Sequence, residues 1–170
     1  MQHFGFDPGD PVFELAGWAL SFQIVTLENL YGLSRDDIQL EAAPLGWTIR
    51  CGRLAWAGQQ EQAAGRFEAQ ILREGERGLR ISTSASAPFP IRAVKLMVRR
   101  LPQLAVLDML DQPRDVAWNG LLEEYPNQLR LPLWLVQPAE GPLLGLRCED
   151  AEVRPKRLAA FEERMGSLAG

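Results

Sequence analysis

Two acidic segments contain the residue types that could hydrolyse a glycosidic bond. The segment "LDMLDQPRD" contributes Asp108, Asp111 and Asp115, and "LLEEYP" contributes Glu123 and Glu124. Glycoside hydrolysis uses two carboxyl groups, one held protonated as the acid and the other ionised. Acids beside proline, glutamine and asparagine are also ordinary loop residues, and sequence spacing does not give the separation of two carboxyl groups. Asp108, Asp111 and Glu123 are therefore the catalytic candidates of an alternative hypothesis, that of a small glycoside hydrolase.

The five tryptophans offer a second kind of chemistry, because a flat indole can stack against a sugar or a base. Four of them fall within alternating strand patterns, namely Trp18, Trp47, Trp56 and Trp134. These four are expected mostly in the core. Trp118 differs, because in "DVAWNG" it precedes a glycine and is expected in an exposed loop. We therefore predict a ligand-binding surface at Trp118 and the nearby carboxylate of Asp115.

The chain has few residues that could hold a metal or act as a nucleophile. Its only cysteines are Cys51 and Cys148, and its only histidine is His3. These three residues make a poor zinc ligand set, and each cysteine is more typical of a small buried apolar residue. A Cys–His or Ser–His–Asp arrangement would have to recruit His3 from the N-terminal segment. The sequence also lacks a glycine-rich phosphate loop, so we expect no metal and no cofactor.

The balance of charge argues against nucleic acid as a partner. The 18 basic and 22 acidic residues give a net charge of −4, whereas proteins that grip phosphate backbones usually show a basic excess. The most apolar early run, residues 18–27, is too short to span a bilayer, and no Lys or Arg precedes it as in a signal peptide. We therefore expect a soluble, cytoplasmic protein without a membrane partner.

The spread of prolines and glycines divides the chain into short pieces, which is typical of an all-β domain. Alternation of apolar and polar residues predicts strands near 18–24 and 38–42. Two pairs of alternating runs joined by glycine-containing turns predict hairpins near 67–87 and 129–148. Pro132 lacks an amide donor, so its strand is expected at a sheet edge or at a bulge.

The run 47–57 predicts one strand with a kink. Trp47, Ile49 and Cys51 share one parity, whereas Leu54 has the other parity. A one-residue slip at a glycine is what a β-bulge produces, so the kink is expected near Gly52.

The segment "PIRAVKLMVRRLP", residues 90–102, fits two periods. Its apolar residues alternate as in a half-buried strand, but Val94 and Leu101 also fit one helical face. Prolines bracket a run too short for a stable isolated helix, and its β-branched residues favour a strand. The outward Lys95 and Arg99 could contact anions, but the acidic net charge favours a solvated face whose charges discourage edge pairing.

The last element is predicted to be an amphipathic helix at about 155–168. Pro155 suits a first helical turn, and polar residues such as Lys156 occupy the opposite face. The apolar residues that recur at helical spacing are Leu158, Phe161, Met165 and Leu168.

The order of these elements resembles a known family. An alternating strand series followed by "PIRAVKLMVRRLP", "EEYPNQLRLPLWLVQPAEGPLLGLRCED" and "RPKRLAAF" is similar to the N-terminal β-sandwich domain of large multidomain glycoside hydrolases. This resemblance implies a domain without catalytic acids that packs against a catalytic barrel and can lend a loop to the substrate cleft. It places no catalytic residue of that family on this sequence.

Taken together, the sequence predicts an antiparallel β-sandwich of about eight or nine strands with a C-terminal helix, in a single domain spanning 1–170. The predicted function is a non-catalytic, carbohydrate-associated accessory or binding domain. Its partner would be carbohydrate or a catalytic domain, linked or separate. Two alternatives stay open: the small hydrolase, and a structural module that self-associates into a homo-oligomer through the helix or the edge at Pro132.

Overall fold

The computed structural model gives a mainly antiparallel β protein, as predicted. It describes residues 3–7, 10–15, 18–75, 78–99, 104–115, 119–136, 144–148 and 156–161. The chain divides into two compact units, Met1–Arg100 and Leu101–Gly170, and each is described by itself. The single domain spanning 1–170 stays a prediction.

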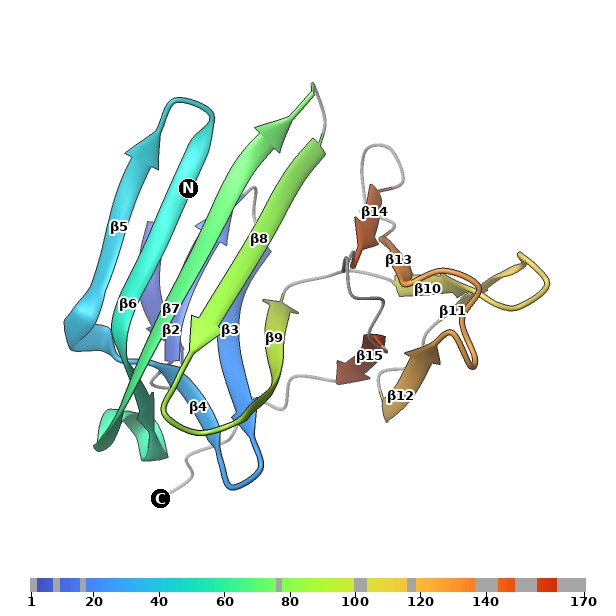
Figure 1. Ribbon diagram of the computed structural model, residues 1–170. Helices are drawn as coiled ribbons and strands as arrows, with labels where there is room; N and C mark the ends of the chain where they lie inside the picture. Colours follow the sequence, from blue (N-terminus) through green and yellow to red (C-terminus); the bar gives the residue numbers. More distant parts are fainter. Residues whose placement is uncertain are drawn as a thin grey trace, which may run out of the picture. The chain divides into compact units, whose positions relative to one another are not determined.

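The first unit contains one sheet of nine strands, in which every pair of neighbours is antiparallel (Figure 1). The strands are β1 (His3–Asp7), β2 (Asp10–Leu15), β3 (Trp18–Thr26), β4 (Leu30–Leu33), β5 (Ile38–Ala43), β6 (Gly46–Trp56), β7 (Glu61–Glu74), β8 (Gly78–Ser86) and β9 (Ile91–Arg99). Two short 3-10 helices, η1 (Arg35–Asp37) and η2 (Ala57–Gln59), follow β4 and β6. The strands expected in this half of the chain are therefore confirmed.

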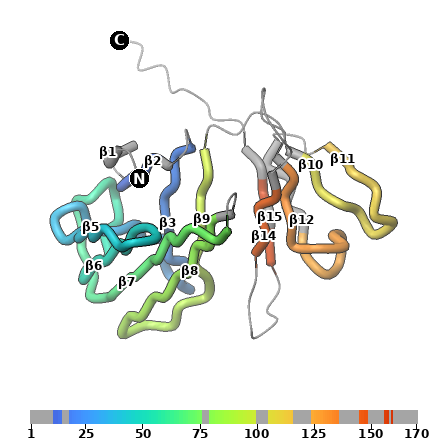
Figure 2. Tube along the Cα trace, turned by 90° about the horizontal axis from the view of Figure 1, so that it is seen from above, coloured from blue at the N-terminus to red at the C-terminus, as the bar shows by residue number. Residues whose placement is uncertain are grey.

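The sheet curls because the four-residue strand β4 pairs with two long strands. The last residues of β3 pair with Leu30 and Tyr31, while Gly32 and Leu33 pair with the end of β6. The start of β3 pairs with β2 on the same edge, and its other edge pairs with β9. One half of the sheet is therefore β1, β2, β3 and β9, and the other half is β5–β8, which bends around from it (Figure 2).

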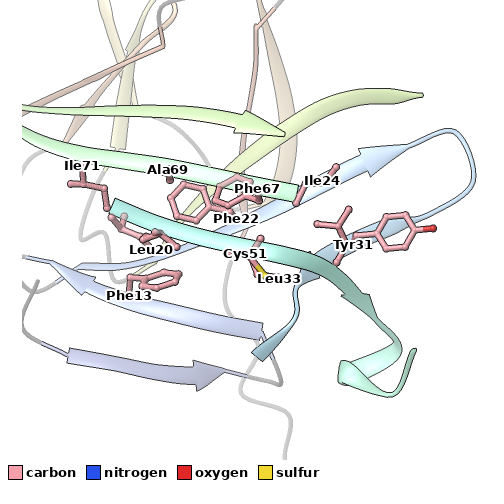
Figure 3. Packing of buried hydrophobic residues seen from close by; sticks show 12 residues of the cluster. Phe13, Leu20, Phe22, Ile24, Tyr31, Leu33, Cys51, Phe67, Ala69 and Ile71 are labelled. Atoms are coloured by element: carbon pink, nitrogen blue, oxygen red, sulfur yellow. The ribbon is translucent and has the colours of Figure 1, made fainter. Parts of the chain in front are cut away.

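The core lies between these two halves of the sheet. Phe22 of β3 packs against Phe67 of β7, with ring centroids 5.0 Å apart, and against Phe13 of β2, at 6.2 Å (Figure 3). All three side chains are buried. Full burial of one such side chain contributes about 1.5–3 kcal/mol, so the alternating residues of each strand hold the halves together through their inward face.

The slip predicted in β6 is confirmed. Cys51 lies opposite Phe67 of β7, whereas Arg53 lies opposite Ala64, so the register shifts across Gly52. Because of this shift, Cys51 and Leu54 are both buried although they differ in parity. The bulge therefore lets β6 follow the curl without exposing either set of apolar residues.

A stack of three aromatic rings lies at one end of the curled sheet. Tyr31 of β4 stacks on Trp56 of β6 at 5.4 Å and on Phe89 at 5.2 Å, with interplanar angles of 13° and 15°. Phe89 belongs to the connection between β8 and β9, which lies at the same end of the sheet as η2 (Figure 1). Tyr31 is buried between the other two rings, so the stack fills the interior at this end.

The segment with two periods forms β9, so the strand interpretation is confirmed. Val94 and Val98 pack against the core, and Lys95 is exposed opposite Gln23 of β3. Leu96, expected inward with the two valines, is 41% exposed. The reason is that β9 pairs only with β3 among the described strands, and β8 pairs only with β7. The described sheet therefore has a seam between β8 and β9, which we define as their two unpaired edges.

The second unit contains two small antiparallel sheets among the described residues. In the larger sheet the order is β11 (Pro113–Asp115), β10 (Leu104–Leu107), β13 (Leu133–Val136) and β14 (Leu144–Arg147). In the smaller one β12 (Asn119–Tyr125) pairs with β15 (Lys156–Phe161). The predicted hairpin near 129–148 is present in a shorter form as β13 and β14. Neither the edge nor the bulge expected at Pro132 is found, because Pro132 precedes β13, which has neighbours on both sides and no register shift.

The C-terminal helix was a wrong prediction over 156–161, where the chain forms β15. A short apolar run fits both periods, and here pairing with β12 decides between them. Lys156, expected on a solvated helix face, is 8% exposed, while Arg157 is exposed and lies 2.9 Å from Glu124 of β12. Residue 155 and residues 162–168 of the predicted helix lie outside the described residues.

The β-sandwich of eight or nine strands is also corrected by the described residues. They contain fifteen strands, and in the first unit one continuous sheet encloses the core between its own halves. Period-two patterns predict which face of a strand is buried, but not whether the facing strands belong to the same sheet. The strand β4 joins the two halves into one sheet. It pairs through only two residues with β3 and two with β6, and such short pairings leave no pattern in the sequence.

The packing of Phe22 gives a test of the core. We expect Phe22→Ala to lower the free energy of unfolding by about 3–5 kcal/mol, because the truncation leaves a cavity between the two halves of the sheet. Leu27→Ala, at a position 68% exposed, should change it by less than about 0.5 kcal/mol. Urea unfolding followed by circular dichroism measures both values. A cost for Phe22→Ala no larger than that for Leu27→Ala would contradict a core between the halves.

Candidate ligand-binding site

Two of the predicted catalytic acids lie in the connection between β10 and β11. The carboxylate of Asp108 accepts hydrogen bonds from the backbone N–H groups of Leu110 and Gln112, at 2.8 and 3.0 Å. Asp111 lies 3.4 Å from the guanidinium of Arg130. Asp108 thus stabilises the turn, whereas Asp111 forms a solvent-exposed ion pair. The backbone of Glu123 lies in β12, and its side chain is outside the described residues, so the catalytic trio stays a prediction.

The predicted ligand-binding pair lies only partly within the described residues. Asp115 is the exposed last residue of β11, opposite Ala105 of β10. Trp118 lies outside the described residues. The surface expected at these two positions therefore stays a prediction.

The other four tryptophans lie in strands, but they are less buried than expected. Trp18, Trp47 and Trp134 are half-buried, and Trp56 is 37% exposed. Trp18, Trp47 and Trp56 stand at or next to a strand end. Partly exposed indoles at strand ends are the side chains that can contact a ligand.

Trp47 leads to a pocket that we call the end pocket. It is a cavity of about 380 Å³, lined by residues 42–47, Ile71, Arg73 and Leu79. It lies at the end of the sheet opposite the aromatic stack, where the β5–β6 turn and the β7–β8 hairpin end side by side (Figure 1). The aromatic stack and the end pocket thus lie at opposite ends of the curled sheet.

The lining follows from the register of three strands. Trp47 of β6 lies opposite Ile71 of β7, and Arg73, two residues further along β7, lies opposite Leu79 of β8. Because side chains alternate along a strand, Arg73 stands on the same face of the sheet as the buried Ile71. The remaining rim is the β5–β6 turn, whose Leu45 is 65% exposed.

Gly46 brings β6 and β7 close together beneath the pocket. A Cβ atom on Gly46 would overlap the carbonyl oxygen of Ile71, which is part of the backbone and cannot rotate away. The backbone N–H of Arg73 donates a hydrogen bond of 2.7 Å to the carbonyl oxygen of Leu45. These two features fix the turn against β7 and set the position of the pocket floor.

The charges on the two faces of β6 and β7 are arranged differently. On the outer face, Arg50 lies 2.5 Å from Glu41 and 3.0 Å from Glu68, and its hydrogen bond lowers the pKa of the Glu68 carboxyl. In the end pocket, the side chain of Arg73 forms no hydrogen bond or ion pair with any of the residues that the structure describes. None of the described residues that line this pocket is acidic.

A second hollow, of about 200 Å³, lies at the corner of the sheet near Trp56 and η2. The side-chain amide of Gln59, which lines this hollow, already has hydrogen-bond partners. Its Oε1 accepts a hydrogen bond from the backbone N–H of Arg35 at 2.8 Å, and its Nε2 donates one to the Leu33 carbonyl at 2.9 Å. Gln59 and Ala57 have positive φ angles of 76° and 45°. The tight turn thus serves to anchor β4, and the hollow is the weaker candidate.

The two cysteines differ, because Cys51 is buried, as expected, whereas Cys148 is exposed. The Cys51 thiol donates to the carbonyl oxygen of Arg53 at 2.9 Å, and burial raises its pKa, so the thiol stays protonated. Within the described ranges, no group of three or more His, Cys, Asp or Glu residues could hold a metal ion. The helices of this part of the chain include none long and apolar enough to cross a membrane.

Sequence reasoning missed the end pocket, although two signals for it exist. The apolar parity of Phe67, Ala69 and Ile71 continues to Arg73, which places a cation on the inward face of β7. Leu45 is a large apolar residue in a two-residue turn, where polar residues are usual. Neither signal reveals that the turn and Arg73 meet, because that depends on pairing between β6 and β7.

The comparisons with known proteins identify no relative of this chain. No family model, no curated protein and no solved structure matches the chain. The resemblance to the N-terminal domains of glycoside hydrolases therefore stays a prediction, and the function is argued from the site.

The close approach at Gly46 gives a test of the pocket floor. We expect Gly46→Ala to lower the free energy of unfolding by about 1–3 kcal/mol, because the added methyl group must push β6 away from β7. Gly52→Ala is the matched control, since its methyl group would meet only the movable carboxylate of Asp37. Thermal unfolding of the two variants compares them directly. If Gly46→Ala were as stable as Gly52→Ala, the two strands would not be as close as described.

Proposed function

We propose that this chain is a non-catalytic binding module whose ligand occupies the end pocket. The observation that carries the proposal is the combination of an apolar lining with exposed leucines at the rim. Leu45 and Leu79 are 65% and 48% exposed, while Ile71 beneath them is buried. Covering exposed apolar side chains is the main favourable term in binding a small molecule to such a pocket.

The absence of acids from the pocket lining supports a binding role over hydrolysis. A glycosidase needs two carboxyl groups beside the bound substrate, and the described residues that line the end pocket include none. Of the acids proposed from the sequence, Asp108 holds a turn and Asp111 faces Arg130. The volume of about 380 Å³ lies at the lower end of the range for ligand sites, which favours a small ligand.

The rim leucines give the test of this proposal. We expect decanol, an uncharged apolar probe, to shift the NMR signals of the Trp47 indole and of residues 42–46. Leu45→Ser should weaken this binding about fivefold, because covering a mostly exposed leucine contributes about 1 kcal/mol.

Leu27→Ser is the matched control, because Leu27 is 68% exposed in the β3–β4 turn at the other end of the sheet. It should bind as the unmodified protein does. Signal changes spread evenly over the surface, or equal weakening in the two variants, would refute a binding site at the end pocket.

A carbohydrate-associated accessory role is the second candidate, and the half-buried indole of Trp47 in the pocket favours it. The sequence places the sugar-binding surface at Trp118 and Asp115. We expect a glycan-array signal that is lost in Trp118→Ala and kept in Leu45→Ser, since only the first change removes the stacking face. A chain that binds no glycan on the array would contradict this role, and loss of the signal in Leu45→Ser alone would move the sugar site to the end pocket.

A further inference from the structure

The position of Arg73 indicates which chemical class of ligand fits the end pocket. This inference rests on the proposed binding function. The neighbours of Arg73 on the inward face are apolar: Ile71 on the same strand and Leu79 opposite. Two arginines near it have carboxylate partners: Arg50 contacts two glutamates, and Arg80 on the opposite face contacts Glu74. Arg73 contacts no carboxylate among the described residues, although it stands beside a pocket.

A cation at the edge of an apolar pocket is complementary to an anion that carries an apolar group. The guanidinium is planar and can donate two parallel hydrogen bonds to one carboxylate. The exposed Leu45 and Leu79 and the indole of Trp47 offer apolar surface around the same cavity. Among the described residues, Arg73 is the one cation of the lining, and its single charge matches a singly charged head group.

We propose that the end pocket binds a small amphiphilic carboxylate, with the carboxylate on Arg73 and the apolar body against Trp47, Leu45 and Leu79. Recognition then has two separable parts. The apolar contacts supply most of the affinity, because they cover exposed leucine surface. The arginine supplies selectivity for an anion over an uncharged molecule of the same shape.

The experiment compares decanoate with decanol on the full chain, by calorimetry or by the fluorescence of the tryptophans. We expect decanoate to bind about tenfold more tightly than decanol, because hydrogen bonds to charged groups are among the stronger ones. Arg73→Met should remove this preference, so that decanoate and decanol bind with about the same affinity. Arg66→Met is the matched control, since Arg66 is an exposed residue on the opposite face of β7, and it should keep the preference.

Charge reversal makes the test independent of a simple loss of stability. Arg73→Glu should bind decylammonium more tightly than decanoate, which a variant that merely fails to fold could not do. Equal binding of decanoate and decanol by the unmodified protein would overturn the inference and leave the binding function standing. Binding of neither probe would refute the proposed function itself. Equal loss of preference in Arg66→Met and Arg73→Met would assign the effect to general surface charge and overturn the inference.

Discussion

The pairing of β4 with both β3 and β6 is the constraint on which the rest of the first unit depends. Four residues satisfy the backbone hydrogen bonds of two longer strands, at the point where each strand has lost its previous neighbour. Because these groups must be paired when they are buried, the sheet has to turn at β4. The turn brings Phe22 over Phe67, and this packing encloses the core. Gln59 of η2 holds the end of β4 through the Leu33 carbonyl, so the corner is anchored from outside as well.

The sequence predicted β3 and β5–β9 of the first unit from their alternation, but not β1, β2 or β4. Phe67, Ala69 and Ile71 alternate with polar residues, and the slip at Gly52 could be read from the change of parity between Cys51 and Leu54. This reasoning is local, since a period of two states which residues point the same way. It does not state which strands face each other, and for that reason a sandwich was expected where one sheet curls.

The second unit shows where local patterns become ambiguous. The residues of β15 fit a helical stripe as well as a strand, and the partner strand β12 makes the difference. A candidate site is harder still to predict, because its residues come from separate strands. Trp47 and Arg73 are far apart in the chain, and only the register of β6 on β7 and of β7 on β8 places them around one cavity. The sequence signals were present, but their meaning depended on tertiary pairing.

The seam between β8 and β9 has a mechanical consequence. A closed ring of strands can change its diameter only by breaking or sliding rows of backbone hydrogen bonds. The first unit instead resembles a split ring, because within its described sheet β8 and β9 are each bonded on one side. The unpaired edges of β8 and β9 can move apart or together while the backbone hydrogen bonds between all paired strands stay intact. The aromatic stack of Trp56, Tyr31 and Phe89 links β4, β6 and the β8–β9 connection at one end of the sheet, so it opposes such movement there.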